Sequence, residues 1–203
     1  MSTKQRIAIV VPVVLVAVMY PVFQLLAKPF RGTWRIGWYL GLAVYWLIWG
    51  VAFPMLLVGR ERIARLIRPR RLTVRVLLLA MVPLVGASIY RLVPGMEYHT
   101  SSWWELPLLL SSCLGNGLFE EVLWRGVYME MFPENILLRI VWPSIWFALW
   151  HYLPGSVNPN GNALGLIIGS GLMGFYLSFL AKKTDTVWWA IVGHTLGGII
   201  MVV

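Results

Sequence analysis

The chain has 203 residues, of which 59% are hydrophobic and 12% are charged, and its mean hydropathy is +0.75. This composition is typical of a polytopic membrane protein and excludes a soluble helical bundle, because most of the apolar runs lack a polar face. The formal net charge is +9, but seven of the seventeen Lys and Arg residues fall within residues 59–75, so the charge is concentrated in one segment.

Seven apolar segments are long enough to cross a bilayer as helices, since a span needs about 20 residues. They are continuous rather than alternating, which excludes a transmembrane β-barrel. We therefore predict an all-α fold, a polytopic transmembrane helix bundle that forms a single membrane domain over residues 1–203. Residues 1–105 hold the three N-terminal spans, and residues 106–203 hold the helices that carry motifs. The predicted spans are residues 7–27, 36–58, 76–93, 106–127, 136–152, 164–181 and 187–203.

The first span follows Lys4 and Arg6 and is too long for the apolar core of a secretory signal, so we expect it to be retained. Placing residues 59–75 in the cytoplasm and alternating the spans puts thirteen basic residues inside and four outside, in agreement with the positive-inside rule. The N-terminus is then cytoplasmic. The excess of basic residues on the cytoplasmic side explains the net charge. We therefore predict membrane lipids as partners and no nucleic-acid partner. The compact size and the plain charge bias fit the inner (plasma) membrane of a bacterium.

Two adjacent glutamates lie inside the fourth predicted span, in the stretch LFEEVLWRG at residues 118–126. Ionisable groups inside a membrane are costly unless they are paired, so they are candidates for function. In a helix, Glu121 and Arg125 are four residues apart and form a salt bridge on one face. Glu120 points about 100° away, on a face with Asn116, and is left without a counter-ion. A free glutamate suits general acid–base catalysis, whereas the alternative is a structural network between helices.

Two histidines lie in later predicted spans. His151 closes the stretch FALWH, with Phe147 one turn before it, and His194 lies in the last span. One histidine in a span is usually a hydrogen-bonding group between helices, but two of them beside Glu120 could position and deprotonate a water molecule. Strict alternation of the spans places His151 near the outer end of its span and His194 nearer the inner end of the other. They meet only if the fifth helix sits deep or the helices surround a wet cavity.

Three motifs in chain order resemble the signature of a known family. They are EEVLWR (Glu120 to Arg125), FALWH (Phe147 to His151) and the histidine of the final span. This order is similar to the EExxxR, FxxxH and HxxxN or HxxxD motifs of the CAAX-protease and bacteriocin-processing (Abi) family. That family consists of intramembrane endopeptidases and includes the Ras-converting CAAX endopeptidases. The resemblance covers residues 106–200.

The resemblance implies that Glu120 activates the attacking water, and that His151 and His194 orient this water and stabilise the oxyanion formed at the scissile carbonyl. We expect the substrate to be a peptide or a membrane protein. We expect the cut near the cytoplasmic face, where Arg125 and the loop of residues 128–139 place the helix that carries the two glutamates. The resemblance further implies supporting roles, in holding the helix in shape and in lining the cavity, for Glu121, Arg125 and Phe147.

In one place the chain departs from the family pattern. Four residues after His194, where the family has Asn or Asp, this chain has Gly198. An amide at that position would donate a hydrogen bond to the oxyanion, and losing one such donor typically costs about 10²–10³ in rate. Either Asn116, one turn before Glu120 on the same face, supplies the missing amide, or the protein has given up catalysis and kept the fold.

The chain has no HExxH motif, so the two-histidine zinc helix of soluble metalloproteases is absent. Glu120, His151 and His194 could still form an open zinc site, as in a metalloprotease, from separate helices. A metal-free mechanism uses the same residues and is preferred, because Glu120 cannot be both a zinc ligand and a free base. The expected cofactor is therefore none or zinc.

Three functions remain open from the sequence. The first is an intramembrane endopeptidase, a CAAX-type protease. The second, motivated by Gly198, is a catalytically inactive member of the same fold that serves as a subunit or accessory factor of a membrane complex, in transport or self-immunity. The third is proton-coupled transport through the same polar residues, for which inverted repeats would be expected that this sequence does not show.

Overall fold

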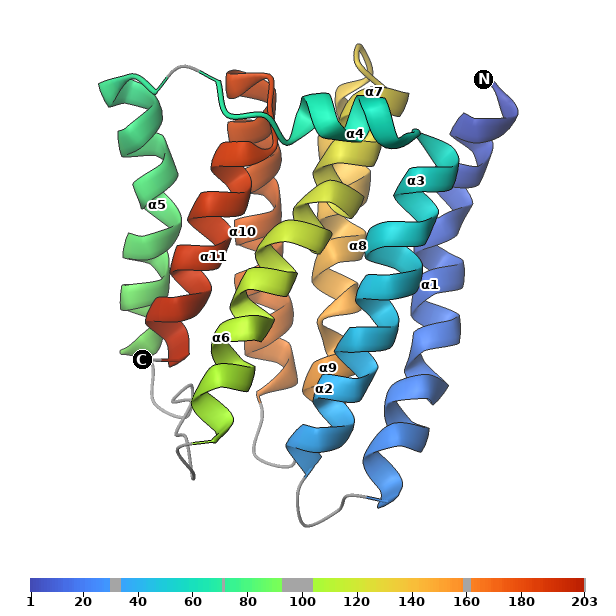
Figure 1. Ribbon diagram of the computed structural model, residues 1–203, viewed down its shortest axis with the longest axis vertical. Helices are drawn as coiled ribbons and strands as arrows, with labels where there is room; N and C mark the ends of the chain where they lie inside the picture. The colour runs from blue at the N-terminus through green and yellow to red at the C-terminus, as the bar shows by residue number, and fades with distance from the viewer. Residues whose placement is uncertain (30–33, 71, 93–103, 159–161, 203) are drawn as a thin grey trace.

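The protein is a bundle of helices in a computed structural model, which describes residues 1–29, 34–70, 72–92, 104–158 and 162–202 (Figure 1). No β-strand occurs in these residues, and the predicted all-α membrane fold is confirmed. The helices are α1 (Thr3–Ala27), α2 (Trp34–Tyr45), η2 (Trp46–Ala52), α3 (Phe53–Leu57), α4 (Arg60–Leu66), α5 (Val74–Arg91), α6 (Glu105–Gly115), η3 (Asn116–Glu120), η4 (Val122–Gly126), α7 (Val127–Met131), η5 (Leu137–Val141), α8 (Trp142–Trp150), α9 (Tyr152–Ser156), α10 (Ala163–Thr184) and α11 (Trp188–Val202).

Five helical segments of the described chain are long and apolar enough to cross a membrane. They are α1, α2 continued through α3, α5, α6 continued through α7, and α10. Each corresponds to one of the predicted spans. The other two predicted spans, residues 136–152 and 187–203, form shorter helices, namely η5 with α8, and α11. Both join the bundle, because α8 packs against α10 and α11 packs against α5.

Local sequence explains where several of these helices begin. α1 starts at a capping box, in which the backbone N–H of Gln5 donates to the Ser2 hydroxyl and the backbone N–H of Ser2 donates to the Gln5 side chain. α3 and α4 are joined at Gly59, whose φ of +96° is accessible to glycine without strain. This turn lays α4 across the end of the bundle at which α1 begins (Figure 1).

Two clusters of buried apolar side chains position the helix that runs from α6 through α7, which carries Glu120 and Glu121 and is called the motif helix below. The first joins α1, α2, η4 and α8, and includes the large side chains of Phe23, Tyr45 and Trp124. The second joins α10 and α11, and includes Leu177 and Ile191. Because α11 also packs against η3, the motif helix lies between the two clusters.

One predicted loop is shorter than expected. Residues 154–162, PGSVNPNGN, are rich in turn-forming residues, which predicts an irregular connection. In the structure, Pro154 and Gly155 belong to α9 and are buried, and residues 159–161 lie outside the described part of the chain. Helical structure therefore continues past His151, and the chain stays against the bundle there.

Candidate active site

The helix that carries the two glutamates departs from regular α-helical geometry on both sides of Glu121. It passes through the π-helical turns η3 and η4, which end at Glu120 and Gly126. Such turns form i→i+5 hydrogen bonds and occur frequently at functional sites. On η3, Gly117 permits a close approach of α11, since a Cβ atom there would lie 2.0 Å from Oγ1 of Thr195. The sequence predicted a regular helix here, so the π-helical turns are a difference that the apolar periodicity did not indicate.

Glu121 is the centre of a buried polar network. Its Oε1 accepts one hydrogen bond from Nη1 of Arg125 and another from Nδ1 of His194, each at 2.8 Å. The Arg125 guanidinium also donates to the carbonyl of Gly174 at 3.1 Å and lies 4.2 Å from the ring centroid of Phe147. The predicted salt bridge between Glu121 and Arg125 is confirmed. The network connects the motif helix to α8, α10 and α11.

Glu120 has different surroundings, although its side chain is only 1% exposed. Its Oε1 accepts a hydrogen bond from Nε1 of Trp150 at 3.0 Å. Its Oε2 lies 3.8 Å from Nε2 of His194, which is too far for a hydrogen bond, and has no hydrogen-bond partner among the described residues. One carboxylate oxygen is therefore anchored, and the other is buried without a hydrogen bond.

Trp150 is a site residue that sequence reasoning missed. Periodicity places it on a packed stripe of tryptophans, and it is fully buried. Its indole nevertheless donates to Glu120, and its ring stacks on Tyr45 with the centroids 3.9 Å apart. The available signal was its position directly before His151 in a motif.

The two histidines are separated by an aromatic ring. Nδ1 of His151 donates to the carbonyl of Phe147 at 2.7 Å, because a carbonyl oxygen can only accept. The Phe147 ring packs edge-on against His151, at 4.5 Å between centroids, and against His194, at 6.0 Å. Phe147 is fully buried and spaces the two imidazoles rather than belonging to the cavity lining.

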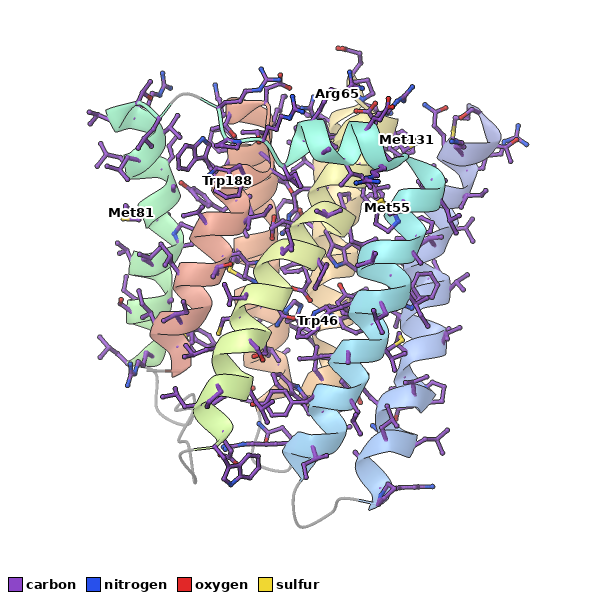
Figure 2. All side chains as sticks on the ribbon, in the orientation of Figure 1. Trp46, Met55, Arg65, Met81, Met131 and Trp188 are labelled. Atoms are coloured by element: carbon purple, nitrogen blue, oxygen red, sulfur yellow. The ribbon has the colours of Figure 1, made fainter. Side chains whose placement is uncertain are left out.

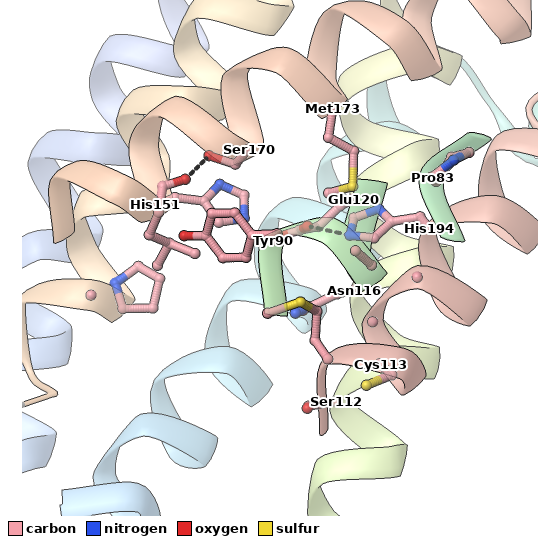
Figure 3. A pocket seen from close by; sticks show the side chains of 18 of the residues that line it. Pro83, Tyr90, Ser112, Cys113, Asn116, Glu120, His151, Ser170, Met173 and His194 are labelled. Carbon is pink, nitrogen blue, oxygen red and sulfur yellow. Dashed lines mark hydrogen bonds and ion pairs between the residues drawn. The ribbon is translucent and has the colours of Figure 1, made fainter. Parts of the chain in front are cut away.

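A cavity of about 850 Å³ brings most of the predicted site residues together. Figure 3 shows His151 on one side of it and Glu120 with His194 on the other. The difficulty that strict alternation of spans raised is thus resolved, since both histidines face one cavity within the bundle. The predicted site residues that line it are Asn116, Glu120, His151 and His194.

The cavity extends away from the glutamates toward one end of the bundle. Its lining comes from α2, α5, α6, α8, α9, α10 and α11, together with η3. It includes Arg35 and Tyr90, which lie near the end of the bundle at which α2 begins and α5 ends (Figure 1). Glu120 is almost fully buried where it meets the cavity, and the wall also carries apolar side chains such as Leu42 and Met173.

The arrangement gives no support to the zinc alternative. Within the described residues, no three His, Cys, Asp or Glu side chains are grouped so that they could hold a metal ion. His151 is separated from Glu120 and His194 across the cavity (Figure 3). Nδ1 of each histidine is already hydrogen-bonded, to Phe147 or to Glu121, so only Nε2 of each ring is left for a ligand or a water molecule.

Comparison with known proteins gives one match. Residues 102–200 match the Rce1-like family model, which describes type II CAAX prenyl endopeptidases. All three motifs lie within the matched residues. No curated protein and no solved structure matches the chain.

Proposed function

The chain belongs, through residues 102–200, to the family of Rce1-like type II CAAX prenyl endopeptidases, and on this premise we propose that it is an intramembrane endopeptidase. The family predicted from the three motifs is thereby confirmed. The substrate in this proposal is a peptide or a membrane protein, and the nucleophile is a water molecule activated by Glu120. The apolar helices make it an integral membrane protein.

The observation that carries the proposal is that Glu120 lines the cavity and keeps one carboxylate oxygen without a hydrogen bond. Its Oε2 and Nε2 of His194 are 3.8 Å apart, a separation that a water molecule admitted from the cavity would bridge at about 2.8 Å from each atom. Glu120 then takes a proton from this water while the water oxygen adds to the scissile carbonyl, and later returns the proton to the leaving amine. His194 orients the water as an acceptor. His151, on the opposite wall, has its Nε2 left to accept a hydrogen bond from the substrate.

The test uses the full chain in liposomes and an internally quenched peptide that ends in a farnesylated CAAX sequence. We expect the wild type to cleave the peptide, and Glu120→Gln to lower the rate by about 10²–10⁴ because the general base is lost. The matched control is Glu130→Gln, whose carboxylate pairs with Arg62 at 3.0 Å, away from the cavity, and which should keep full activity. Equal cleavage by folded Glu120→Gln and wild type would rule the proposal out.

Gly198 favours a second candidate, a subunit of a membrane complex without catalysis. The chain lacks the family's amide at that position, although it keeps the fold. This candidate predicts a stable partner on co-purification and a biological role that survives Glu120→Gln. A protein that purifies alone and loses its role on this change would exclude it.

The charge distribution supports a bacterial inner membrane with a cytoplasmic N-terminus. The arginines of α4 lie at the end of the bundle at which α1 begins, and Figure 2 shows Arg65 at that end. Cytoplasmic segments carry the excess of basic residues, so this end would face the cytoplasm and its lipid headgroups.

A further inference from the structure

Cleavage by a glutamate-activated water needs a hydrogen-bond donor, because negative charge develops on the scissile carbonyl oxygen. The family pattern would put that donor four residues after His194, where this chain has Gly198. A Cβ atom at Gly198 would lie 3.3 Å from Sγ and 3.4 Å from Cβ of Cys113. A longer side chain there would have to displace Cys113, so in this chain the donor has to come from another position.

The histidines do not supply it as neutral rings. Nδ1 of His151 donates to the carbonyl of Phe147, and Nδ1 of His194 donates to the carboxylate of Glu121. A neutral imidazole has a single N–H, so Nε2 of each ring is an acceptor. An acceptor can orient a water molecule but cannot stabilise an oxyanion.

Asn116 presents an amide with a fixed orientation. Nε1 of Trp46 lies 3.0 Å from its Oδ1, and an indole can only donate, so the atom that faces Trp46 is the oxygen. The amide nitrogen Nδ2 therefore points away from Trp46, with two N–H groups. No acceptor for Nδ2 is found in the described part of the chain, and Asn116 lines the same cavity as Glu120 (Figure 3).

The orienting tryptophan is itself held firmly. Its ring lies against Gly115, where a Cβ atom would be 2.6 Å from Cζ2 of the indole, and packs on Phe119 with the centroids 5.9 Å apart. Figure 2 shows Trp46 within the bundle, on the helix beside the motif helix. The π-helical turn η3 begins at Asn116 and ends at Glu120, so the amide and the base belong to one turn.

Resting on the proposed function, we propose that Asn116 is the oxyanion donor of this protein. Glu120 removes a proton from water, the C–O bond forms, and the carbonyl electron pair moves to the oxygen, which accepts a hydrogen bond from Nδ2 of Asn116. When the electron pair returns, the C–N bond breaks and the proton held by Glu120 goes to the amine. In this protein the donating amide therefore lies on the motif helix, whereas the family pattern has it on the final helix.

Asn116→Asp and Asn116→Ala test this with the farnesylated quenched peptide and the protein in liposomes. Asn116→Asp keeps an oxygen for Trp46 but has no donor, and Asn116→Ala removes the whole amide. We expect both to lower kcat by about 10²–10³ with little change in KM, because the oxyanion forms in the transition state and is absent from the bound substrate. Thermal unfolding should stay close to that of the wild type for at least one of the two.

Glu130→Gln is again the control that should keep full activity, since its carboxylate pairs with Arg62 away from the cavity. Tyr90→Phe tests the rival donor, since the Tyr90 hydroxyl has no partner among the described residues and lines the same cavity. In Figure 3 this hydroxyl points to the side of His151, so Tyr90→Phe should lower kcat much less than Asn116→Ala does. Asn116→Ala with an unchanged kcat, or a hundredfold loss in Tyr90→Phe alone, would overturn the assignment to Asn116. A wild type that fails to cleave, or Glu120→Gln that cleaves normally, would instead overturn the proposed function and this assignment with it.

Discussion

Glu120 and Glu121 are neighbours in the chain, yet the protein neutralises only one of them. Two donors, Arg125 and His194, share a single oxygen of Glu121. The Glu121 carboxylate is therefore paired inside the bundle. Glu120 receives one neutral donor, Trp150, and keeps an oxygen without a hydrogen bond. Oε2 of Glu121 also has no hydrogen bond among the described residues, but only Glu120 lines the cavity. An unsatisfied buried oxygen lowers stability, and such exceptions to good packing are expected at functional sites.

The different surroundings predict different effects of the same substitution. Glu121→Gln leaves the Arg125 guanidinium buried without its counter-ion, and we expect a loss of about 3–5 kcal/mol in the free energy of unfolding. Glu120→Gln removes no salt bridge to arginine, and its amide oxygen can still accept from Trp150, so the free energy of unfolding should change little. Thermal unfolding of both variants in detergent checks this. Equal melting temperatures for the two would contradict the division of roles.

The bond from Trp150 to Glu120 makes a further prediction at this scale. Trp150→Phe removes the indole N–H but keeps a ring to stack on Tyr45, so the fold should persist. A hydrogen bond to a charged group contributes about 1.5–3 kcal/mol, and we expect at least a tenfold fall in kcat. Trp142→Phe is the matched control, since the Trp142 indole N–H has no partner among the described residues. Similar activities in the two variants would show that Trp150 only packs.

At the scale of elements, the approach of η3 to α11 decides whether Glu120 meets His194. Gly117 sits at this crossing, against the hydroxyl and the backbone nitrogen of Thr195. The contact leaves no room for a side chain on the motif helix. The distance between Glu120 and His194 therefore depends on Gly117, which has no side chain and takes no part in the reaction.

Gly117→Ala should consequently separate the two helices. Overpacking of this kind typically costs about 1–3 kcal/mol, and we expect a lower melting temperature together with a loss of cleavage. Gly86→Ala is the control, because a Cβ atom there would have no heavy atom within 4 Å and alanine favours a helix. Comparable stability of the two variants would show that the crossing is looser than the structure indicates.

The outcome for these elements shows what a single sequence can predict. Apolar runs predict the helices, and a four-residue spacing predicts the pair of Glu121 and Arg125, because both depend on local periodicity. The π-helical turns η3 and η4 are wound differently but span only five residues each, too few to change the apolar pattern, and were missed. The bond between Trp150 and Glu120 joins residues thirty positions apart on different helices, so no local pattern could reveal it. The same holds for the cavity, whose described wall is formed by seven α-helices together with η3.

At the scale of the whole molecule, the basic residues and the cavity lie toward opposite ends. α4 carries Arg60 and Arg65 at the end at which α1 begins, and the positive-inside rule predicts that this end faces the cytoplasm. The cavity extends from Glu120 the other way, toward Arg35 and Tyr90. The sequence motifs predicted cleavage near the cytoplasmic face. The cavity instead favours entry of the substrate from the opposite face.

Cysteine labelling in intact cells tests this direction of entry. Cys113 is the only cysteine, so Cys113→Ala gives a background without thiols, into which Gly86→Cys places one thiol on the cavity wall. Val74→Cys and Leu92→Cys mark the two ends of α5, where the native side chains are 75% and 82% exposed. A membrane-impermeant thiol reagent added outside should label Leu92→Cys and Gly86→Cys, because water reaches the cavity from that face, and should label Val74→Cys only after permeabilisation. If Gly86→Cys, like Val74→Cys, is labelled only after permeabilisation, the entrance of the cavity lies on the cytoplasmic face.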